Sequence, residues 1–514
     1  MRVAFYDCGD GNLGVQYLLA VLKSRGHDAR LFFDNSLSRN YLAQDLFVAP
    51  LLSISEDDVC RGLLELEPEV ACFSLFTYFY RDTMSLIRRL KHWAPELPII
   101  CGGVHATIVP EIVIENPEVD FVVVGEAEAS LPILIAAIED TSVGAVKSLP
   151  AGAMPGVWNV SNGAVVNRGV SPVITDLDTI AFPDKRQHVA ENPSLAVMYT
   201  MVASRGCFGQ CTYCNSATLN RIYHEQGIRY YRVRSVENVI EEIRLAVQEF
   251  HPRHIEFYDD CFGAKRSWLR DFCARYKSEI GLPFGIQTAP TVHDEESIEL
   301  LADAGCVCLE FGLQSANPDV RRYCLNRKES NEAVKRLIRK ALDLGIFIEL
   351  DLILNLPGET REHIQQAIEF VRETRPQLVH AGFLQYFPRT PIVKTAIEQG
   401  VISADDVPRF ERGEQSNSMR LLSRSGLDKH YRILPMQIFV ASRLPGWLSR
   451  PLVRAAEWPI ISTACSLLAS PFIYASRLVL GFTDSRNTFA RRQAIRTVYG
   501  AKWVLRKKCS RRRR

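Results

Sequence analysis

Short apolar runs alternate with segments whose apolar residues recur at helical spacing, and this rhythm begins at the N-terminus. In residues 1–140 it predicts buried strands at 3–6, 29–33, 70–73, 99–101 and 121–124. Helices are predicted between them, at 13–25, 56–66, 80–92 and 130–139. This alternation indicates an α/β domain with a Rossmann-like open parallel sheet, which contacts ligands at the carboxyl ends of its strands.

The same rhythm returns between residues 195 and 400. Six strands are predicted there, at 195–203, 254–258, 284–288, 306–312, 346–354 and 380–387. The intervening helices are predicted at 236–250, 265–280, 294–304, 331–344 and 361–374. Six strands with helices between them predict a partial (β/α)6 barrel of the TIM type, whose functional groups belong at the carboxyl ends of the strands.

Between these two domains, residues 141–194 lose the pattern and are rich in Gly, Pro, Ser and Asn. We expect a linker with one β-hairpin that turns at Asn162-Gly163, because Asn-Gly favours tight hairpin turns. The length of 514 residues fits two or three domains. Hydrophobic residues make up 47% and charged residues 23%, as in an ordinary globular protein. With no signal-peptide pattern at the N-terminus, the 14 cysteines are expected to be reduced thiols in a cytoplasm.

The C-terminal part, residues 401–514, is expected to be a basic and mainly helical extension. Residues 415–514 hold 20 Lys and Arg against 3 Asp and Glu, although the whole chain has a net charge of only +2. Residues 458–476 carry no charge, but two prolines argue against a membrane-spanning helix there. Three roles stay open: peripheral association with the inner face of a membrane, a helical cap on the barrel and, less favoured, nucleic-acid binding.

Cys207, Cys211 and Cys214 form a C-x3-C-x2-C triplet directly after the first strand of the predicted barrel. Composition alone predicts about 0.01 such triplets in the chain. Three thiolates this close can hold three corners of a cubane iron–sulfur cluster, which leaves one iron open to another ligand. The alternatives are buried thiols or a zinc site, which would need a fourth Cys or His; the nearest candidate is His224.

With this placement, the chain resembles the radical S-adenosylmethionine (SAM) superfamily, specifically its members with an N-terminal cobalamin-binding domain. The resemblance covers roughly residues 1–400. It implies that Cys207, Cys211 and Cys214 hold a [4Fe–4S] cluster whose open iron binds SAM. One electron from the cluster would then cleave SAM to methionine and a 5′-deoxyadenosyl radical. No catalytic residue beyond the cluster is assigned.

The resemblance also implies where SAM would bind. The residues assigned to it are Tyr213, Asp259, Asp260, Glu310, Gln314, Ser315 and Asn355. Tyr213 would lie beside the adenine, and the two aspartates near the amino group, unless they form an ordinary solvated turn. The segment from Glu310 to Ser315 resembles the one that contacts the ribose and carboxylate. Asn355 stands where the family usually has Gly, as does Arg389, to which no role is assigned.

The N-terminal domain resembles cobalamin-binding domains at several strand ends. The residues assigned to cobalamin are Asn12, Leu13, Gly14, Ser74, Gly102, Gly103, His105, Gly125 and Glu126. Gly102-Gly103 follows a strand and would let a large planar ligand approach the backbone, although a lone pair of glycines is more often a tight turn. The first loop lacks the histidine that many cobalamin domains supply to cobalt. We therefore predict cobalamin bound without a histidine ligand from this loop, with His105 as a contact or a satisfied core group.

The function that follows from the resemblance is methylation of an unactivated carbon of a small molecule, for example a lipid, an isoprenoid or a tetrapyrrole. The alternatives are a radical cyclisation or rearrangement without methyl transfer, and a non-catalytic corrinoid or iron–sulfur sensor. The SAM-binding segments argue against a sensor, which would not need them. An electron donor of the flavodoxin or ferredoxin type is the expected protein partner.

Overall fold

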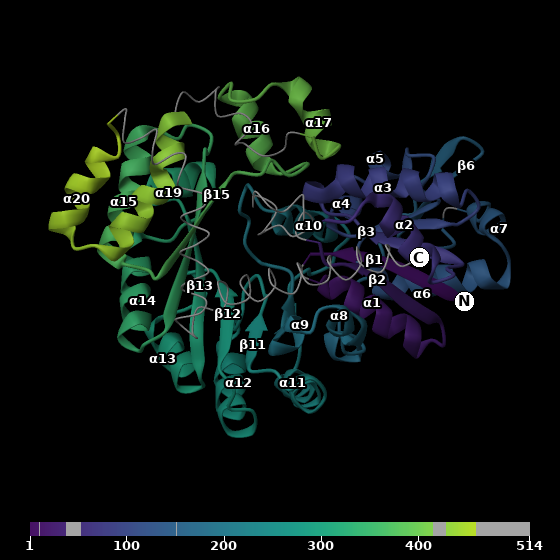
Figure 1. Cartoon of the computed structure of the whole chain (residues 1–514), viewed down its shortest axis with the longest axis horizontal. Coiled ribbons are helices and arrows are strands. Elements are labelled where there is room, and N and C mark those ends of the chain that lie inside the picture. The colour runs from purple at the N-terminus through teal and green to yellow at the C-terminus, as the bar shows by residue number, and fades with distance from the viewer. Residues whose placement is uncertain (10, 37–52, 151, 415–427, 459–514) are drawn as a thin grey trace, which may run out of the picture. The chain divides into compact units, whose positions relative to one another are not determined.

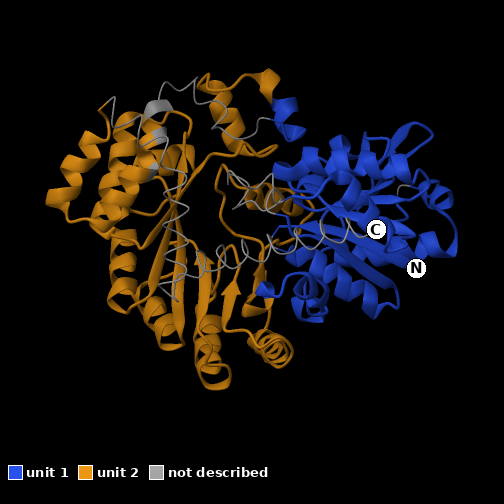
Figure 2. Ribbon diagram, in the orientation of Figure 1, with its two compact units in different colours: residues 1–195, 407–414, 495–514 blue, residues 196–406, 415–494 orange. Residues whose placement is uncertain are grey.

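The computed structural model describes residues 1–458 except 10, 37–52, 151 and 415–427 (Figure 1). The described residues divide into two compact units (Figure 2). Residues 1–195 and 407–414 form the first unit, and residues 196–406 and 428–458 the second. Among the helices of this described part, none combines the length and the apolar composition that crossing a bilayer requires.

The first unit is built on a seven-stranded sheet with the order β2-β1-β3-β4-β5-β6-β7. Its strands are β1 (Arg2–Cys8), β2 (Asp28–Asp34), β3 (Val70–Ser74), β4 (Ile99–Gly102), β5 (Phe121–Val123), β6 (Val157–Ser161) and β7 (Ala164–Val166). β1 to β5 pair in parallel, as predicted. The chain reverses its winding direction between β1 and β3, and doubly wound sheets bind ligands at such a point.

Helices cover both faces of this sheet. They are α1 (Leu13–Ser24), α2 (Glu56–Leu64), α3 (Tyr80–Trp93), α4 (Val104–Ile108), α5 (Pro110–Ile114), α6 (Ala127–Asp140), α7 (Val143–Lys147), α8 (Arg186–Glu191), and the short turns η3 (Thr77–Phe79) and η4 (Leu177–Thr179). α1 and α6 share one hydrophobic core with the sheet, and α2, α3 and α5 share another. The short helices α4 and α5 fall where no helix was predicted, because five residues are too few to show a helical period.

The segment expected as a linker adds structure to the first unit. β6 pairs antiparallel with β5 and continues into β7, so the hairpin extends the sheet. Asn162 and Gly163 have φ of 51° and 75°, as the two central residues of a tight type I′ turn require. The predicted hairpin is therefore confirmed, whereas the domain boundaries at 140 and 400 stay predictions.

The second unit contains six parallel strands whose order in space is their order in the chain. They are β8 (Met198–Met201), β11 (His254–Phe257), β12 (Phe284–Thr288), β13 (Cys306–Gln314), β14 (Phe347–Leu354) and β15 (Leu378–Phe383). The helices between them are α11 (Val236–Phe250), α12 (Arg266–Glu279), α13 (Glu295–Asp303), α14 (Asn331–Asp343) and α15 (Arg361–Thr374). This is the predicted partial (β/α)6 barrel; β8 starts later than expected because α9 (Ser194–Val197) precedes it.

Several shorter elements complete the second unit. They are the two-stranded ribbon β9 (Ser204–Arg205) and β10 (Arg232–Val233), α10 (Asn215–His224), a single π-helical turn η5 (Val320–Cys324), α16 (Pro391–Glu398), η6 (Ala404–Asp406), α19 (Asp428–Arg443) and α20 (Gly446–Ala455). α17 (Val407–Glu411) belongs to the first unit.

The described part of the C-terminal extension packs on the barrel. α19 lies against α15, and α20 lies against α19. Tyr431, Leu434, Ile438 and Ala441 of α19 belong to the same hydrophobic core as the barrel strands. This arrangement supports the predicted helical cap for residues 428–458. The uncharged stretch from residue 459 onward and the basic end of the chain lie outside the described residues.

Candidate functional site

The three cysteines of the triplet lie in the loop that follows β8 and β9, at the carboxyl end of the first barrel strand. Cys214 is the N-cap residue of α10. The Gly209 amide donates a hydrogen bond to Cys207 Sγ at 3.2 Å. A Cβ atom at position 209 would lie 3.2 Å from Cys207 Sγ and 3.8 Å from Cys211 Sγ, so both sulfurs face the space that this glycine leaves open. We call this loop the cysteine cradle: Cys207 and Cys211 share one space in it, and their thiolates are soft ligands of the kind that iron–sulfur clusters take.

Asp259, at the end of β11, anchors the start of this loop. Its carboxylate accepts a hydrogen bond from the Ala203 amide at 3.0 Å and another from the Ser204 hydroxyl. The side chain is buried, and burial raises its pKa to about 6. Asp260 accepts a hydrogen bond from the Ser216 hydroxyl at 2.8 Å. Both aspartates, expected near the SAM amino group, thus have hydrogen-bond partners in or beside the cysteine loop.

A fourth thiol, which the sequence did not single out, lies beside the triplet. Cys261 Sγ is 3.2 Å from Cys207 Sγ. Their hydrogen bond lowers the pKa of Cys207 and raises that of Cys261. The only sequence signal for Cys261 is its position directly after Asp259 and Asp260 at a strand end.

Arg327 links the cysteine loop to the carboxyl end of β13. Its guanidinium donates to the Tyr213 hydroxyl at 3.1 Å, to the Gly312 carbonyl at 2.6 Å and to Glu329 at 2.5 Å. Burial raises the pKa of Tyr213, which is therefore a neutral phenol. No motif marks Arg327, so sequence reasoning missed it.

The residues assigned to the SAM ribose and carboxylate lie along the end of β13. Gln287 donates a hydrogen bond to Glu310 at 2.9 Å, and burial together with the nearby Glu349 raises the pKa of Glu310 to about 7. Gln314 has φ of 67°, a left-handed conformation that is uncommon outside glycine. Ser315 is buried, and its carbonyl accepts from Arg321. Gln314 and Ser315 lie at the end of β13 and Glu310 lies four residues before it; that they contact SAM stays a prediction.

Asn355 follows β14 in a turn that the C-terminal extension supports. Its φ of 57° is in the left-handed region, which glycine adopts most readily and Asn more readily than most other residues. Arg389 also has a left-handed φ, of 60°, at a position where glycine is usual. The Asn355 amide donates to Glu359 at 2.7 Å, and the Tyr431 hydroxyl of α19 donates to the same carboxyl. Burial raises the pKa of Glu359 to about 7. Sequence reasoning identified neither Glu359 nor Tyr431 as part of the site.

Replacement of Tyr431 by Phe should destabilise the protein more at pH 8.5 than at pH 5.5. Glu359 has a folded-state pKa above its unfolded value, so the folded state loses stability as pH rises through that window. Tyr431 opposes this loss by donating to the carboxylate, and a hydrogen bond to a charged group contributes about 1.5–3 kcal/mol. Thermal melting at both pH values measures the difference. Tyr276→Phe is the matched control, since the described residues offer the buried Tyr276 hydroxyl no partner; an equal loss in both variants contradicts the prediction.

In the first unit, a small cavity of about 150 Å³ lies at the carboxyl ends of β3, β4 and β5, between the sheet and α1 and α6. Six of the residues assigned to cobalamin line it: Gly14, Ser74, Gly102, Gly103, Gly125 and Glu126. Asn12 belongs to the same edge, because its side-chain amide donates to Ser74 Oγ at 2.9 Å across the β1–β3 switch point. No histidine is among the described residues that line the cavity.

The two adjacent glycines of this cavity have different roles. Gly103 has φ of 93°, and a Cβ there would lie 2.8 Å from Ser74 Oγ and 2.9 Å from the Leu75 amide, so only glycine fits. At Gly102 the nearest atom to a Cβ is the Val123 carbonyl oxygen, 3.6 Å away. The protein itself would therefore tolerate a side chain at Gly102. A glycine at such a position leaves the backbone accessible to a ligand.

The other two assigned residues do not line the cavity. His105 is buried in the core of the opposite face, where its ring lies 4.3 Å from that of Tyr80 and Nδ1 is 3.0 Å from Thr77 Oγ1. Burial lowers its pKa to about 4, so the ring is neutral. Leu13 is the first residue of α1, beside the cavity-lining Gly14.

Two family models match separate parts of the chain. Residues 201–371 match the Radical SAM superfamily, and residues 11–135 match the B12 binding domain. An uncharacterized methyltransferase of Pyrococcus horikoshii is 24% identical over 76% of this chain and 79% of its own length. Anaerobic magnesium-protoporphyrin IX monomethyl ester cyclase of Rubrivivax gelatinosus is 26% identical over 73% of this chain and 64% of its own.

A solved structure shares the fold of this chain. The cobalamin-dependent S-adenosylmethionine radical enzyme OxsB, solved with aqua-cobalamin and S-adenosylmethionine bound, superposes with a TM-score of 0.63 at 14% identity, over 98% of this chain and 79% of that one. The matches confirm the predicted fold class and the predicted cofactors, since a radical SAM domain implies a [4Fe–4S] cluster and SAM and a B12 domain implies cobalamin.

Proposed function

Because residues 201–371 match the Radical SAM superfamily and residues 11–135 match the B12 binding domain, we propose that the chain methylates an unactivated carbon of a small-molecule substrate. The observation that carries the proposal is the cysteine cradle at the carboxyl end of the first barrel strand, in a chain that also has an open glycine edge on a doubly wound sheet. The [4Fe–4S] cluster with SAM would supply a radical at the cysteine cradle, and cobalamin would supply a methyl group at the glycine edge. Relatives named as methyltransferases support this reaction over the alternatives.

We assign the cluster to Cys207, Cys211 and Cys214, and SAM to the loop and strand ends around Tyr213 and Glu310. When bound, the cluster and SAM supply a 5′-deoxyadenosyl radical, and cobalamin supplies the methyl group. Asp259 fixes the entry of the cysteine loop, and Arg327 holds Tyr213 against the end of β13. These contacts keep the cradle in register with the strands that surround SAM.

For cobalamin, the cavity is too small to admit a corrin ring and would hold only a part of the cofactor, with Gly102 among the residues that would contact it. Asn12 and Ser74 would fix the rim at the switch point. The experiment is anaerobic reconstitution with iron, sulfide and hydroxocobalamin, followed by reductant, SAM and candidate substrates. 5′-Deoxyadenosine together with S-adenosylhomocysteine supports methyl transfer. 5′-Deoxyadenosine alone supports cyclisation, the reaction in the name of the Rubrivivax relative. The absence of both products contradicts the proposal.

We also propose that α20 places the protein on an anionic membrane surface, which would suit a lipophilic substrate. Trp447 and Arg454 are seven residues apart and so share one stripe of α20, and Trp458 lies three residues beyond the end of this helix. The two tryptophans are 78% and 66% exposed, and Arg450 and Arg454 flank them. The one acidic residue of this segment, Glu457, is paired with Arg361. Exposed Trp beside Arg suits the interface of an anionic bilayer.

Flotation with vesicles rich in phosphatidylserine tests this surface. The double variant Trp447→Ser/Trp458→Ser should bind such vesicles at least roughly a hundredfold more weakly than the parent, since burying each large apolar side chain contributes about 1.5–3 kcal/mol. Trp93→Ser, which removes a partly exposed tryptophan of the first unit, should bind like the parent. Equal flotation of the double variant and the parent refutes the role of α20.

A further inference from the structure

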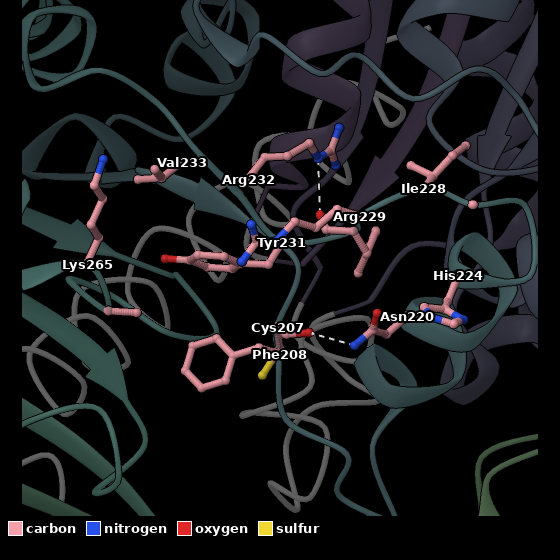
Figure 3. A pocket seen from close by; sticks show the side chains of 13 residues that line it. Cys207, Phe208, Asn220, His224, Ile228, Arg229, Tyr231, Arg232, Val233 and Lys265 are labelled. Carbon is pink, nitrogen blue, oxygen red and sulfur yellow. Dashed lines mark hydrogen bonds between the residues drawn. The ribbon is translucent and has the colours of Figure 1, made fainter.

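A second pocket, with a volume of about 990 Å³, lies beside Cys207 in the second unit (Figure 3). We call it the Cys207 pocket. Its described walls come from the cysteine loop, the end of α10 with the loop that follows it, β10 and the residues just before α12. Glu310 and the other residues assigned to SAM do not belong to this lining. The pocket therefore adjoins a cluster ligand but is separate from the proposed SAM site.

The charged residues that line the pocket are all basic. Arg229, Arg232 and Lys265 contribute to it together with His224, and the described lining contains no Asp or Glu. Arg229, Lys265 and His224 are exposed. Arg232 is buried; it donates from Nε to the Tyr230 carbonyl at 3.1 Å and lies 5.9 Å from the centre of the Tyr230 ring. The exposed positive charge of the pocket thus comes from Arg229 and Lys265, while Arg232 supports its wall.

Next to Cys207 the pocket is aromatic. Phe208, the neighbour of Cys207, is 51% exposed and meets the ring of Tyr231 edge to face at 5.6 Å. At Gly206 a Cβ would lie 2.7 Å from the Tyr230 ring, so the wall presses directly on the cysteine loop. An exposed aromatic group inside a rim of charges is the usual anatomy of a transient protein interface.

We propose that the Cys207 pocket is the docking surface for an acidic one-electron donor protein of the flavodoxin or ferredoxin type. This inference rests on the proposed function, because only a chain that carries a cluster needs an electron from outside. In the transfer the reduced donor loses one electron and the cluster gains it, its charge falling from +2 to +1. No bond forms or breaks.

The exposure of the charges favours a protein over a small anion. A site for a small anion buries its cations against the ligand, whereas rim charges in solvent mainly steer an oppositely charged protein and raise its association rate. Arg229 and Lys265 have this exposed placement, and they stand on separate segments, the loop after α10 and the residues before α12 (Figure 3).

The test uses the full-length protein loaded with its cluster and measures how fast reduced flavodoxin bleaches the cluster absorbance in a stopped-flow instrument. In the double variant Arg229→Glu/Lys265→Glu the reduction should slow roughly 10- to 100-fold at low ionic strength, and added salt should narrow the difference. Direct binding of flavodoxin should weaken in parallel. Arg339→Glu, at an exposed arginine of α14, should behave like the parent.

Dithionite separates failure of docking from failure of the proposed function. It should reduce the cluster of the double variant as fast as that of the parent and give the same 5′-deoxyadenosine. If flavodoxin reduces the double variant at the parent rate, the docking surface lies elsewhere, while the enzyme activity stands. If inorganic pyrophosphate binds the parent but not the variant and leaves flavodoxin reduction unchanged, the pocket is a small-anion site and the docking proposal is overturned. If dithionite also fails with the parent, the proposed function fails, and the docking proposal with it.

Discussion

Cys207→Ala should abolish the formation of 5′-deoxyadenosine and remove most of the iron–sulfur absorbance from the reconstituted protein. This substitution removes one of the three thiolates that would hold the cubane cluster. It also removes the sulfur to which the Gly209 amide donates a hydrogen bond. Changes in groups that only support metal ligands already cost about 10- to 100-fold, so loss of a ligand should cost at least roughly 100-fold. Iron and sulfide analysis with product quantification by mass spectrometry measures both effects.

Cys261→Ala is the matched control, because its sulfur lies 3.2 Å from Cys207 Sγ but outside the triplet. It should keep the cluster and the parent rate of SAM cleavage. The opposite pattern, with the cluster lost in Cys261→Ala and kept in Cys207→Ala, refutes the assignment of the triplet. Loss in both variants makes Cys261 a necessary neighbour, and circular dichroism then shows whether the barrel still folds.

The sheets could be predicted from the sequence because the buried strands of both units form short apolar runs. The strands of the barrel are buried by helices and are nearly continuous apolar runs, and all six appear where they were expected to within a few residues. The ends were harder to place. β15 starts at Leu378 and ends at Phe383, earlier than predicted, because the apolar run continues past the last residue that pairs with β14.

The sites were predictable to the extent that they consist of short segments. The cysteine triplet and Gly102-Gly103 need particular residues at adjacent positions, so the chain shows them directly. The hydrogen bonds that fix these segments are different. Asp259 reaches Ala203 over 56 residues, Tyr431 reaches Glu359 over 72, and Arg327 reaches Tyr213 over 114. Contacts over such separations follow from the folded topology and leave no periodic pattern.

His105 also shows that the position of a side chain in the fold cannot be read from its sequence neighbours. It stands three residues after Gly102, yet the turn at Gly103 starts α4 and directs the imidazole into the core beside Tyr80. Proximity in sequence to a ligand-binding glycine therefore does not place a side chain at the ligand. A substitution at the open Gly102, one residue before the turn, can therefore test cobalamin binding independently of SAM cleavage.

Gly102→Leu should weaken cobalamin binding and abolish methyl transfer while leaving SAM cleavage intact. Gly102 lines the cavity, and a Cβ there meets nothing closer than 3.6 Å, so the backbone tolerates the change and the added side chain occupies the ligand's space. Overpacking costs about 1–3 kcal/mol, which corresponds to a roughly tenfold to hundredfold weaker affinity. Equilibrium dialysis with hydroxocobalamin measures the affinity, and S-adenosylhomocysteine measures methyl transfer.

Two glycine variants show whether the effect comes from the cavity. Gly144→Leu, in α7 with no atom within 4 Å of its Cβ, should bind cobalamin like the parent. Gly103→Ala should instead lower the melting temperature, because its φ of 93° and a 2.8 Å contact with Ser74 Oγ strain the fold itself. If Gly102→Leu keeps full cobalamin affinity, the ligand binds elsewhere in this domain. If it loses SAM cleavage as well, the cobalamin and radical SAM sites are coupled more tightly than the cavity accounts for, since Gly102 lies in the first unit and the cysteine cradle in the second.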